Sequence, residues 1–520
     1  MIMRFKSIVY VLLLNCLMVL CSSNSWAQNS DNPDDFDVKG FHLDLRIQVM
    51  TPTALNDFAE ELSQLGMNTI IMEYEATYPF KNHATIANEL SYTREEIKNF
   101  VEHCESLGIQ VIPLQQSLGH VEYILRNPRY SHLKEDRKDI SQLCPLEITE
   151  AKGLFLEMFS DMAQMHNSDY IHIGGDETRL LGVCEECSKK VAEVGTSKLF
   201  VDYMKTIAQL VIDLGKKPVM WADMILKHPE AAEEMPKETI FVDWNYGWKI
   251  NHFGDIPALQ NLGFSFWGSP ALRSHPDNWY LTDWPIHFKN QKEFIPYARK
   301  SDYEGMVMTS WSTSGVYGFT WDVGYDVIDM VQLRNTYPLS GFRILLASYA
   351  HSLKTKEPLE PKTFVTEYAK SRFGLTSAEI EKLLNFLFYK PEQIVNGKPV
   401  WSSSISEMKE EYGKIRDELK EVDPEKHNEE FEHFKLMADL RMHYLDFKEV
   451  EARYNSKEFS VDQSSELLKD LDHILADAEK LNDRFCKLNK GFLYDAEIEE
   501  QNELRIQPVK VLYNRLAKVR

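Results

Sequence analysis

Short apolar runs alternate with longer segments of helical periodicity between about residue 39 and residue 350. The short runs are apolar on both faces, as the buried strands of a parallel sheet are. They predict eight strands, at residues 41–45, 68–72, 110–114, 169–173, 217–221, 239–244, 263–267 and 305–311. Each of the first seven strands is followed by helical or loop-and-helix sequence, so the chain predicts eight strand–helix units.

Helix signals fit between these strands. Pro52 stands at the first position of a helix that has an apolar face, and Thr93 and Glu96 form a capping box that opens another. We expect further helices over residues 198–214 and, after the last strand, over 327–353. Eight such units predict an α/β fold of the TIM (β/α)8 barrel type. A doubly wound open sheet is the alternative, but the first strand lacks the glycine-rich phosphate loop of that fold.

The barrel is expected to span residues 38–354, and a change in composition follows it. Lys, Glu, Leu and Phe at helical spacing dominate residues 355–520, which predicts an α-helical C-terminal domain. One stripe of that domain illustrates the pattern: Leu467, Leu468, Leu471, Ile474, Leu475, Ala478 and Leu481.

The N-terminus has the features of an export signal. Arg4 and Lys6 precede an apolar run over residues 8–20, and small residues follow up to Ala27. This predicts a signal peptide over residues 1–27, then a disordered leader over 28–37. We therefore expect an exported protein, periplasmic or extracellular, without a transmembrane segment. Lipid anchoring at Cys21 is the weaker alternative, because the preceding Leu20 is not small.

Composition narrows the classes of partner. The formal net charge of −22 argues against a nucleic acid, whose binding depends on concentrated basic residues. Aromatic residues make up 12% of the chain, with ten Trp, and sugar sites use such rings to cover the apolar faces of a pyranose. Five cysteines remain after residue 27, and Cys184 and Cys187 have the C-x-x-C spacing. Without a second pair this is weak support for zinc, and a disulfide, free thiols or a loop clip remain open.

Polar and aromatic residues gather where the predicted strands end. The active site of a TIM barrel lies at the C-terminal ends of its strands, so these positions are the candidate site. The candidates, in chain order, are Asp44, Arg46, Glu75, His120, Asp176, Glu177, Trp221, Asp223, Trp244, Tyr246, Trp267 and Trp311. Each has an ordinary structural interpretation by itself, but so regular a placement favours a functional site.

The most specific stretch is Tyr170-Ile-His-Ile-Gly-Gly-Asp-Glu177. It predicts a strand that opens through two glycines into two adjacent carboxylates. Neighbouring carboxylates can have well-separated pKa values, which is what acid/base chemistry needs. The stretch resembles the His-x-Gly-Gly-Asp-Glu signature of family 20 glycoside hydrolases, the β-N-acetylhexosaminidases. Further segments resemble the hexosaminidase D-like branch of that family: Phe41-His-Leu-Asp-Leu45, Glu73-Tyr-Glu75, Leu118-Gly-His120 and Trp244-Asn-Tyr246.

The resemblance implies a role for several candidates. Glu177 is the general acid/base, and Asp176 orients the 2-acetamido group of the sugar and stabilises its developing charge. Tyr246 hydrogen-bonds the acetamido carbonyl, and the pocket is walled by Trp221, Trp267 and Trp311. Asp176 is expected to be ionised and Glu177 protonated at the first step. Arg46 stands one residue closer to Asp44 than the corresponding arginine of the family, and Gln116 replaces an acidic residue.

The resemblance implies an exo-acting, retaining β-N-acetylhexosaminidase that releases terminal GlcNAc or GalNAc through an oxazolinium intermediate, without metal or organic cofactor. Two other functions remain as alternatives: a barrel that binds amino sugars without cleaving them, and a glycosidase of another specificity that uses two distant carboxylates. The sequence is silent on the preferred sugar and on the oligomeric state.

Overall fold

Eight parallel strands close into a ring. They follow the order β1, β2, β3, β4, β5, β6, β7 and β9, and β1 pairs with β9 to close the barrel. The predicted TIM barrel is confirmed, and each strand overlaps its predicted run. The strands are β1 (Val38–Asp44), β2 (Thr69–Glu73), β3 (Gln110–Leu114), β4 (Tyr170–His172), β5 (Lys217–Trp221), β6 (Ile240–Trp244), β7 (Ser265–Ser269) and β9 (Gly305–Ser310). A short extra strand that was not predicted, β8 (Ala271–Arg273), pairs with the end of β9.

This computed structural model describes residues 36–518 except 275–276, 313–316, 322–327 and 333–334; over 317–321 and 328–332 it describes the backbone alone. The predicted signal peptide, with Cys21, and leader residues 28–35 lie outside the described residues. The last two residues of the predicted leader belong to the folded unit, since Phe36 is buried and the Asp37 amide donates to the Glu304 carbonyl at 2.9 Å. No helix among the described residues is long and apolar enough to cross a membrane.

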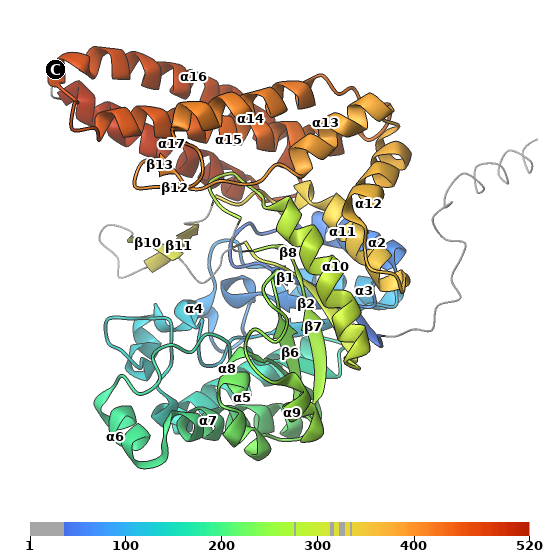
Figure 1. Ribbon diagram of the computed structural model, residues 1–520. Helices are drawn as coiled ribbons and strands as arrows, with labels where there is room; N and C mark the ends of the chain where they lie inside the picture. Colours follow the sequence, from blue (N-terminus) through green and yellow to red (C-terminus); the bar gives the residue numbers. More distant parts are fainter. Residues whose placement is uncertain (1–35, 275–276, 313–316, 322–327, 333–334, 519–520) are drawn as a thin grey trace, which may run out of the picture. The chain divides into compact units, whose positions relative to one another are not determined.

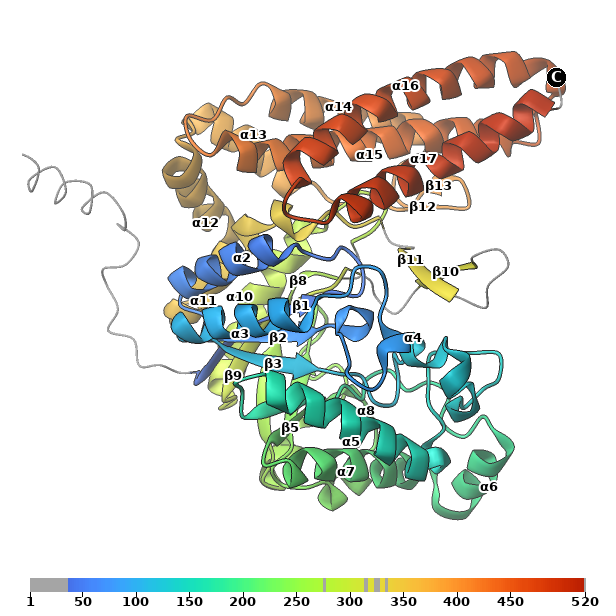
Figure 2. The same cartoon turned by 180° about the vertical axis from the view of Figure 1, so that it is seen from behind.

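Helices cover the outside of the strands (Figures 1 and 2). The Thr51 side chain caps the first of them, α2, and the predicted capping box of Thr93 and Glu96 opens α3. The longer barrel helices are α2 (Pro52–Leu65), α3 (Arg94–Ser106), α5 (Ile148–Met165), α7 (Thr196–Asp213), α10 (Trp284–Lys300) and α11 (Arg343–Lys354). The shorter ones are α4 (Glu122–Leu125), α6 (Glu185–Val194), α8 (Asp223–Lys227) and α9 (Ile256–Asn261).

The helix expected over residues 327–353 is wrong in its first half. Strand β11 (Ile328–Gln332) pairs antiparallel with β10 (Tyr317–Trp321), and α11 begins only at Arg343. Two physical reasons account for this. The hairpin supplies the backbone hydrogen bonds that a helix would otherwise supply, and Pro338 disfavours helical backbone at the residue before it.

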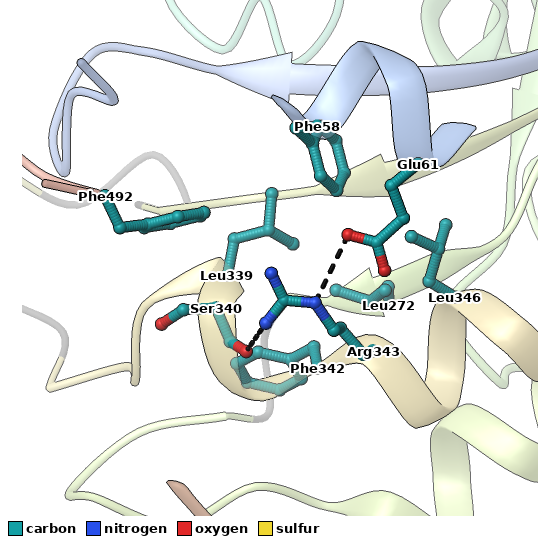
Figure 3. Close-up of a pocket in the computed structure, with 9 residues that line it drawn as sticks. All are labelled: Phe58, Glu61, Leu272, Leu339, Ser340, Phe342, Arg343, Leu346 and Phe492. Atoms are coloured by element: carbon teal, nitrogen blue, oxygen red, sulfur yellow. Dashed lines mark hydrogen bonds and ion pairs between the residues drawn. The ribbon is translucent and has the colours of Figure 1, made fainter. Parts of the chain in front are cut away.

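Arg343 ties α11 to α2. Its Nε donates to Glu61 Oε2 at 3.2 Å, and one terminal nitrogen donates to the Ser340 carbonyl at 3.0 Å. Figure 3 shows these bonds in a small cavity that Phe58 and Phe492 also line. The cavity contains none of the candidate site residues.

The C-terminal region is helical, as predicted, and the expected stripe on α16 is mostly buried. Its helices are α12 (Pro361–Tyr368), α13 (Ser377–Leu387), α14 (Ile405–Lys420), α15 (Asn428–Tyr454), α16 (Ser464–Asn489) and α17 (Asp495–Lys518), with a small unpredicted hairpin of β12 (Ile394–Val395) and β13 (Lys398–Pro399). Residues 36–520 group as one compact unit. The Gln48 amide, for example, donates to Glu497 at 2.6 Å. A domain boundary at residue 355 stays a prediction.

Candidate active site

Two glycines bring the loops after β3 and β4 together. Beyond β4 the chain turns through Gly174 and Gly175, whose φ angles are +70° and +92°. A Cβ atom on Gly174 would lie 1.9 Å from Gln116 Oε1 and 3.0 Å from Gln116 Cα, so a larger residue would force Gln116 to move and would also be strained at this φ angle. The group that approaches the backbone at this strand end is therefore Gln116.

His120 stands between the two adjacent carboxylates. Its Nε2 lies 3.5 Å from Asp176 Oδ2 and 3.3 Å from Glu177 Oε2. Arg179 donates to the other oxygen of Glu177 at 2.6 Å, and the Glu177 backbone amide donates to Asp223 Oδ2 at 3.2 Å. The ends of β3, β4 and β5 thus deliver one imidazole and three carboxylates to a single place.

Three residues of this region have left-handed backbone. The φ angles of Glu75, His120 and Glu177 are +48°, +54° and +48°. Such angles are uncommon for residues other than glycine and cost on the order of 1 kcal/mol or more each. The fold holds these three side chains in place at the expense of backbone strain, as functional sites often do.

The three central groups have strongly shifted pKa values. Burial raises the pKa of Asp176 to about 7, although the positive charge of His120 opposes this. Burial also acts to raise the pKa of Glu177, but the hydrogen bond and charge of His120, with Arg179, lower it to about 2. His120 itself has its pKa raised to about 10, since Asp176 and Glu177 outweigh its burial.

This arrangement reverses the expected protonation of the two carboxylates. The sequence predicts an ionised Asp176 and a protonated Glu177, whereas the structure favours the proton on Asp176. The physical reason is that the two carboxylates differ in burial and in their charged partners. Asp176 has only 8% of its surface exposed, while Glu177 has two cationic partners and a more exposed side chain.

Asp44 and Arg46 form a buried ion pair at the end of β1. Arg46 Nε donates to Asp44 Oδ1 at 2.9 Å, and the Ser312 amide and hydroxyl donate to Asp44 Oδ2 at 2.9 and 2.8 Å. Burial would raise the pKa of Asp44, but Arg46 holds it well below its usual range. The guanidinium also lies 5.3 Å from the Trp311 ring centre. A role for Arg46 in binding sugar stays a prediction.

Most of the predicted aromatic residues lie together. Trp311 Nε1 donates to the Tyr246 hydroxyl at 2.7 Å, and the Trp311 ring centre lies 5.8 Å from that of Trp221. The Trp244 ring centre lies 5.1 Å from that of Tyr246, with the two ring planes tilted by 36°. Trp267 is the exception. It packs against Tyr170, the first residue of β4, and so fills the barrel interior toward the opposite ends of the strands.

The sequence did not single out His42 or Glu73 as site residues. Both are fully buried, and His42 Nε2 lies 2.8 Å from Glu73 Oε2. The ring centre of His42 is 4.6 Å from that of Trp311. The sequence did contain a signal for these two residues. Along a barrel strand every second residue points inward, and a charged residue at such a position is unusual. Glu75 is also buried, which raises its pKa well above the ordinary value.

Several buried polar side-chain atoms at the same strand ends lack a hydrogen-bond partner among the described residues. These atoms include Gln116 Oε1, Asp176 Oδ1, Asp223 Oδ1, Trp221 Nε1 and Trp244 Nε1. Buried polar atoms are nearly always paired in folded proteins. Donors and acceptors that converge among aromatic rings therefore suit a polar ligand with apolar faces, as a sugar is.

Comparison with known proteins gives this geometry its context. Residues 59–313 match the family described as glycosyl hydrolase family 20, catalytic domain. The barrel is a family 20 glycoside hydrolase domain. Both the predicted resemblance and the class of enzyme are thereby confirmed.

Relatives of the family 20 domain include two named proteins. Hexosaminidase D of Bos taurus is 26% identical over 287 residues, which cover 52% of this chain and 83% of that protein. Hexosaminidase D of Homo sapiens is 26% identical over 296 residues, which cover 53% of this chain and 60% of the human protein. A solved β-N-acetylhexosaminidase of Bacteroides fragilis NCTC 9343 is 18% identical, with a TM-score of 0.48 over 65% of this chain and 70% of that one.

Proposed function

We propose that this protein is an exo-acting, retaining β-N-acetylhexosaminidase that uses the acetamido group of its own substrate as the nucleophile. The observation that carries the proposal is the meeting of Asp176, Glu177 and His120 beside unpaired buried polar atoms and the Trp311–Tyr246 pair. On sequence grounds alone, we also propose that it is exported.

The reaction needs one proton donor and one fixed negative charge. The acetamido oxygen attacks the anomeric carbon, the glycosidic C–O bond breaks, and its electron pair leaves with the aglycone oxygen, which takes a proton from Glu177. A water then adds to the oxazolinium and returns a proton to Glu177, so two inversions give net retention. Because the nucleophile is tethered to the substrate, much of the entropy cost of bringing reactants together is avoided.

Asp176 suits the second requirement. Positive charge develops on the acetamido nitrogen as the oxazolinium forms, and a carboxylate beside it stabilises that charge. Burial strengthens this interaction but also raises the pKa of Asp176 to about 7, so the group ionises only near neutrality. The Tyr246 hydroxyl accepts a bond from Trp311 and also neighbours the Thr309 hydroxyl, and with substrate bound it would donate its hydrogen to the acetamido oxygen.

His120 supplies a reservoir for the proton that Glu177 must give. A Glu177 carboxyl with a pKa of about 2 holds almost no proton at neutral pH, yet the imidazolium 3.3 Å away holds one. Transfer of that proton from His120 to Glu177 leaves two neutral groups. The free-energy cost of the transfer falls when a bound sugar excludes water, because the charged pair then loses its hydration. His120 and Glu177 therefore share one proton, which either side chain can hold.

A substitution of Glu177 tests the proposal directly. Glu177→Gln keeps the shape and removes the acid, so hydrolysis of an alkyl N-acetyl-β-hexosaminide should fall by about 10²–10⁴-fold. Glu193→Gln on α6, whose side chain is 67% exposed, is the matched control and should keep full activity. Paired GlcNAc and GalNAc substrates give the sugar preference from the same assay.

Three results test the proposal against the alternatives. Full activity in Glu177→Gln would rule out this acid. Binding of free GlcNAc or GalNAc without hydrolysis of any substrate would indicate an amino-sugar-binding barrel. An oxazoline mimic should inhibit tightly, since it resembles the intermediate; a glycosidase that uses two distant carboxylates would bind it weakly.

A further inference from the structure

Three cysteines and one glutamate meet beside the active-site loops. The side chains are Glu135, Cys144, Cys184 and Cys187, and one ligand atom from each lies within 4.8 Å of every other. The sequence offered only the C-x-x-C pair of Cys184 and Cys187. The fold adds Cys144 and Glu135, which lie 40 residues or more earlier and come from the long connection between β3 and α5.

The spacing matches a tetrahedral metal site. Cys144 Sγ lies 3.5 Å from Cys187 Sγ and 3.8 Å from Cys184 Sγ. A zinc ion bound at about 2.3 Å by each thiolate, at tetrahedral angles, places its sulfur ligands roughly 3.8 Å apart. The Cys144 sulfur is therefore already at ligand spacing from the other two.

Glu135 is held as a fourth ligand would be. It is 2% exposed, and its Oε1 accepts the backbone amides of Val183 and Cys184 at 2.8 and 3.0 Å. Its other oxygen, Oε2, is buried and has no hydrogen-bond partner among the described residues. A buried carboxylate oxygen without a partner is costly unless something positive occupies the space before it. Backbone amides that orient the other oxygen are a common second layer around a metal ligand.

We propose that Glu135, Cys144, Cys184 and Cys187 bind one zinc ion. Thiolates are soft ligands that select zinc over magnesium or calcium, and four protein ligands leave no open position for substrate or water. The site is therefore structural. Binding displaces the thiol protons of the three cysteines, and it needs no oxidant or reductant.

The zinc would join the two loops that carry the catalytic groups. Glu135 and Cys144 lie in the loop that follows His120, and Cys184 caps the start of α6, seven residues after Glu177. These loops already touch, since the Leu180 amide donates to Gln142 Oε1 at 2.8 Å. Within the first loop, Gln142 also forms a β-bridge with Gly119, the neighbour of His120. A metal clip at this point would hold His120 at its distance from Glu177. Figure 1 shows α6 at the margin of the barrel, beside α7.

Metal analysis of the purified full chain tests the proposal. The reduced protein is loaded with zinc chloride, passed through a desalting column, and analysed for zinc by mass spectrometry. We expect about one zinc per chain, retained in Cys486→Ser, which alters an exposed cysteine outside the cluster, and lost in Cys187→Ala. Cobalt in place of zinc should give the charge-transfer absorption of thiolate ligation. Equal zinc in Cys187→Ala would overturn the proposal.

A second measurement on the unaltered protein covers the case in which Cys187→Ala fails to fold. Chelation should lower the midpoint of thermal unfolding by a few degrees, and added zinc should restore it. An unchanged midpoint, with all three thiols open to a thiol reagent in the folded protein, would overturn the proposal. So would a disulfide within the cluster whose reduction leaves thiols that retain no zinc.

Discussion

Removal of the His120 imidazole should change how activity depends on pH. If His120 and Glu177 share one proton, the free protein needs that proton and an ionised Asp176. Burial raises the pKa of Asp176 to about 7, and the neighbouring carboxylates raise that of His120 to about 10. Since kcat/KM reports the free protein, it should rise as pH increases through about 7 and fall through about 10.

In His120→Asn, Glu177 must hold the proton alone. The hydrogen bond and charge that lower its pKa to about 2 are lost, so its pKa should return toward the ordinary 4.5. At pH 7 the protonated fraction of Glu177 is then roughly 10⁻²–10⁻³. In the unaltered protein the bound sugar draws the shared proton from His120 onto Glu177; with this transfer complete, loss of the shared proton should lower kcat/KM to that fraction, a fall of about 10²–10³-fold. The pKa of Asp176 should rise at the same time, because the charge of His120 opposes its ionisation cost.

The assay is kcat/KM between pH 4 and pH 11 on two substrates, one with an alkyl leaving group and one with a dinitrophenyl group that leaves without acid help. The loss should be large for the alkyl substrate and small for the dinitrophenyl substrate. An alkaline limb that stays near pH 10 in His120→Asn would refute the shared proton. Equal losses on both substrates would assign His120 a purely structural role. Glu122 and Arg46 also face His120, so Glu122→Gln is a useful control for general electrostatic effects.

Three further predictions concern neighbouring residues. Burial raises the pKa of Asp176 from 3.8 to about 7, so ionisation of Asp176 costs stability that is absent near pH 4 and grows up to pH 7. Asp176→Asn should therefore raise the free energy of unfolding at pH 8 by up to about 4 kcal/mol, with no gain at pH 4, and should abolish activity. Urea unfolding at both pH values measures the change in stability. Tyr246→Phe should lower kcat by about 10–10³-fold with little change in KM, and a main effect on KM would contradict its role in stabilising the intermediate. Trp267→Phe should lower the midpoint of thermal unfolding and leave KM unchanged, because Trp267 fills the barrel interior. Trp311→Phe should raise KM. The opposite pattern in steady-state kinetics would show that Trp267, and not Trp311, lines the substrate pocket.

The sequence predicted the barrel because a buried parallel strand leaves a continuous apolar run that few other structures produce. It also predicted the meeting of His120, Asp176 and Glu177, since strand ends share one rim. It wrongly placed Trp267 at the rim of the barrel. Both faces of a barrel strand are apolar, so the sequence does not show where the strand ends. An error of a few residues then moves an inward-facing side chain from the interior to the rim. Trp267 lies three residues into β7, with two residues of the strand still to follow.

Other features depend on tertiary contacts that spacing does not encode. Cys144 joins Cys184 and Cys187 only because the loop after β3 packs against the loop after β4. The pKa of Glu177 depends on Arg179, a neighbour in sequence, but also on His120, whose distance from it is set by two strained backbone turns. The hairpin of β10 and β11 shows the same limit, since pairing between strands outweighed local helical periodicity.

Closure of the ring through β1 and β9 has a kinetic consequence. β1 is made first, but its second neighbour begins only at Gly305, so one edge of β1 stays without its partner while the intervening strands are synthesised. At ribosomal rates this lasts on the order of tens of seconds. An open strand edge is a template for wrong pairing. The nascent chain therefore passes through a long aggregation-prone interval, and substitutions that weaken β9 should reduce the yield of folded protein more than the stability of what has folded.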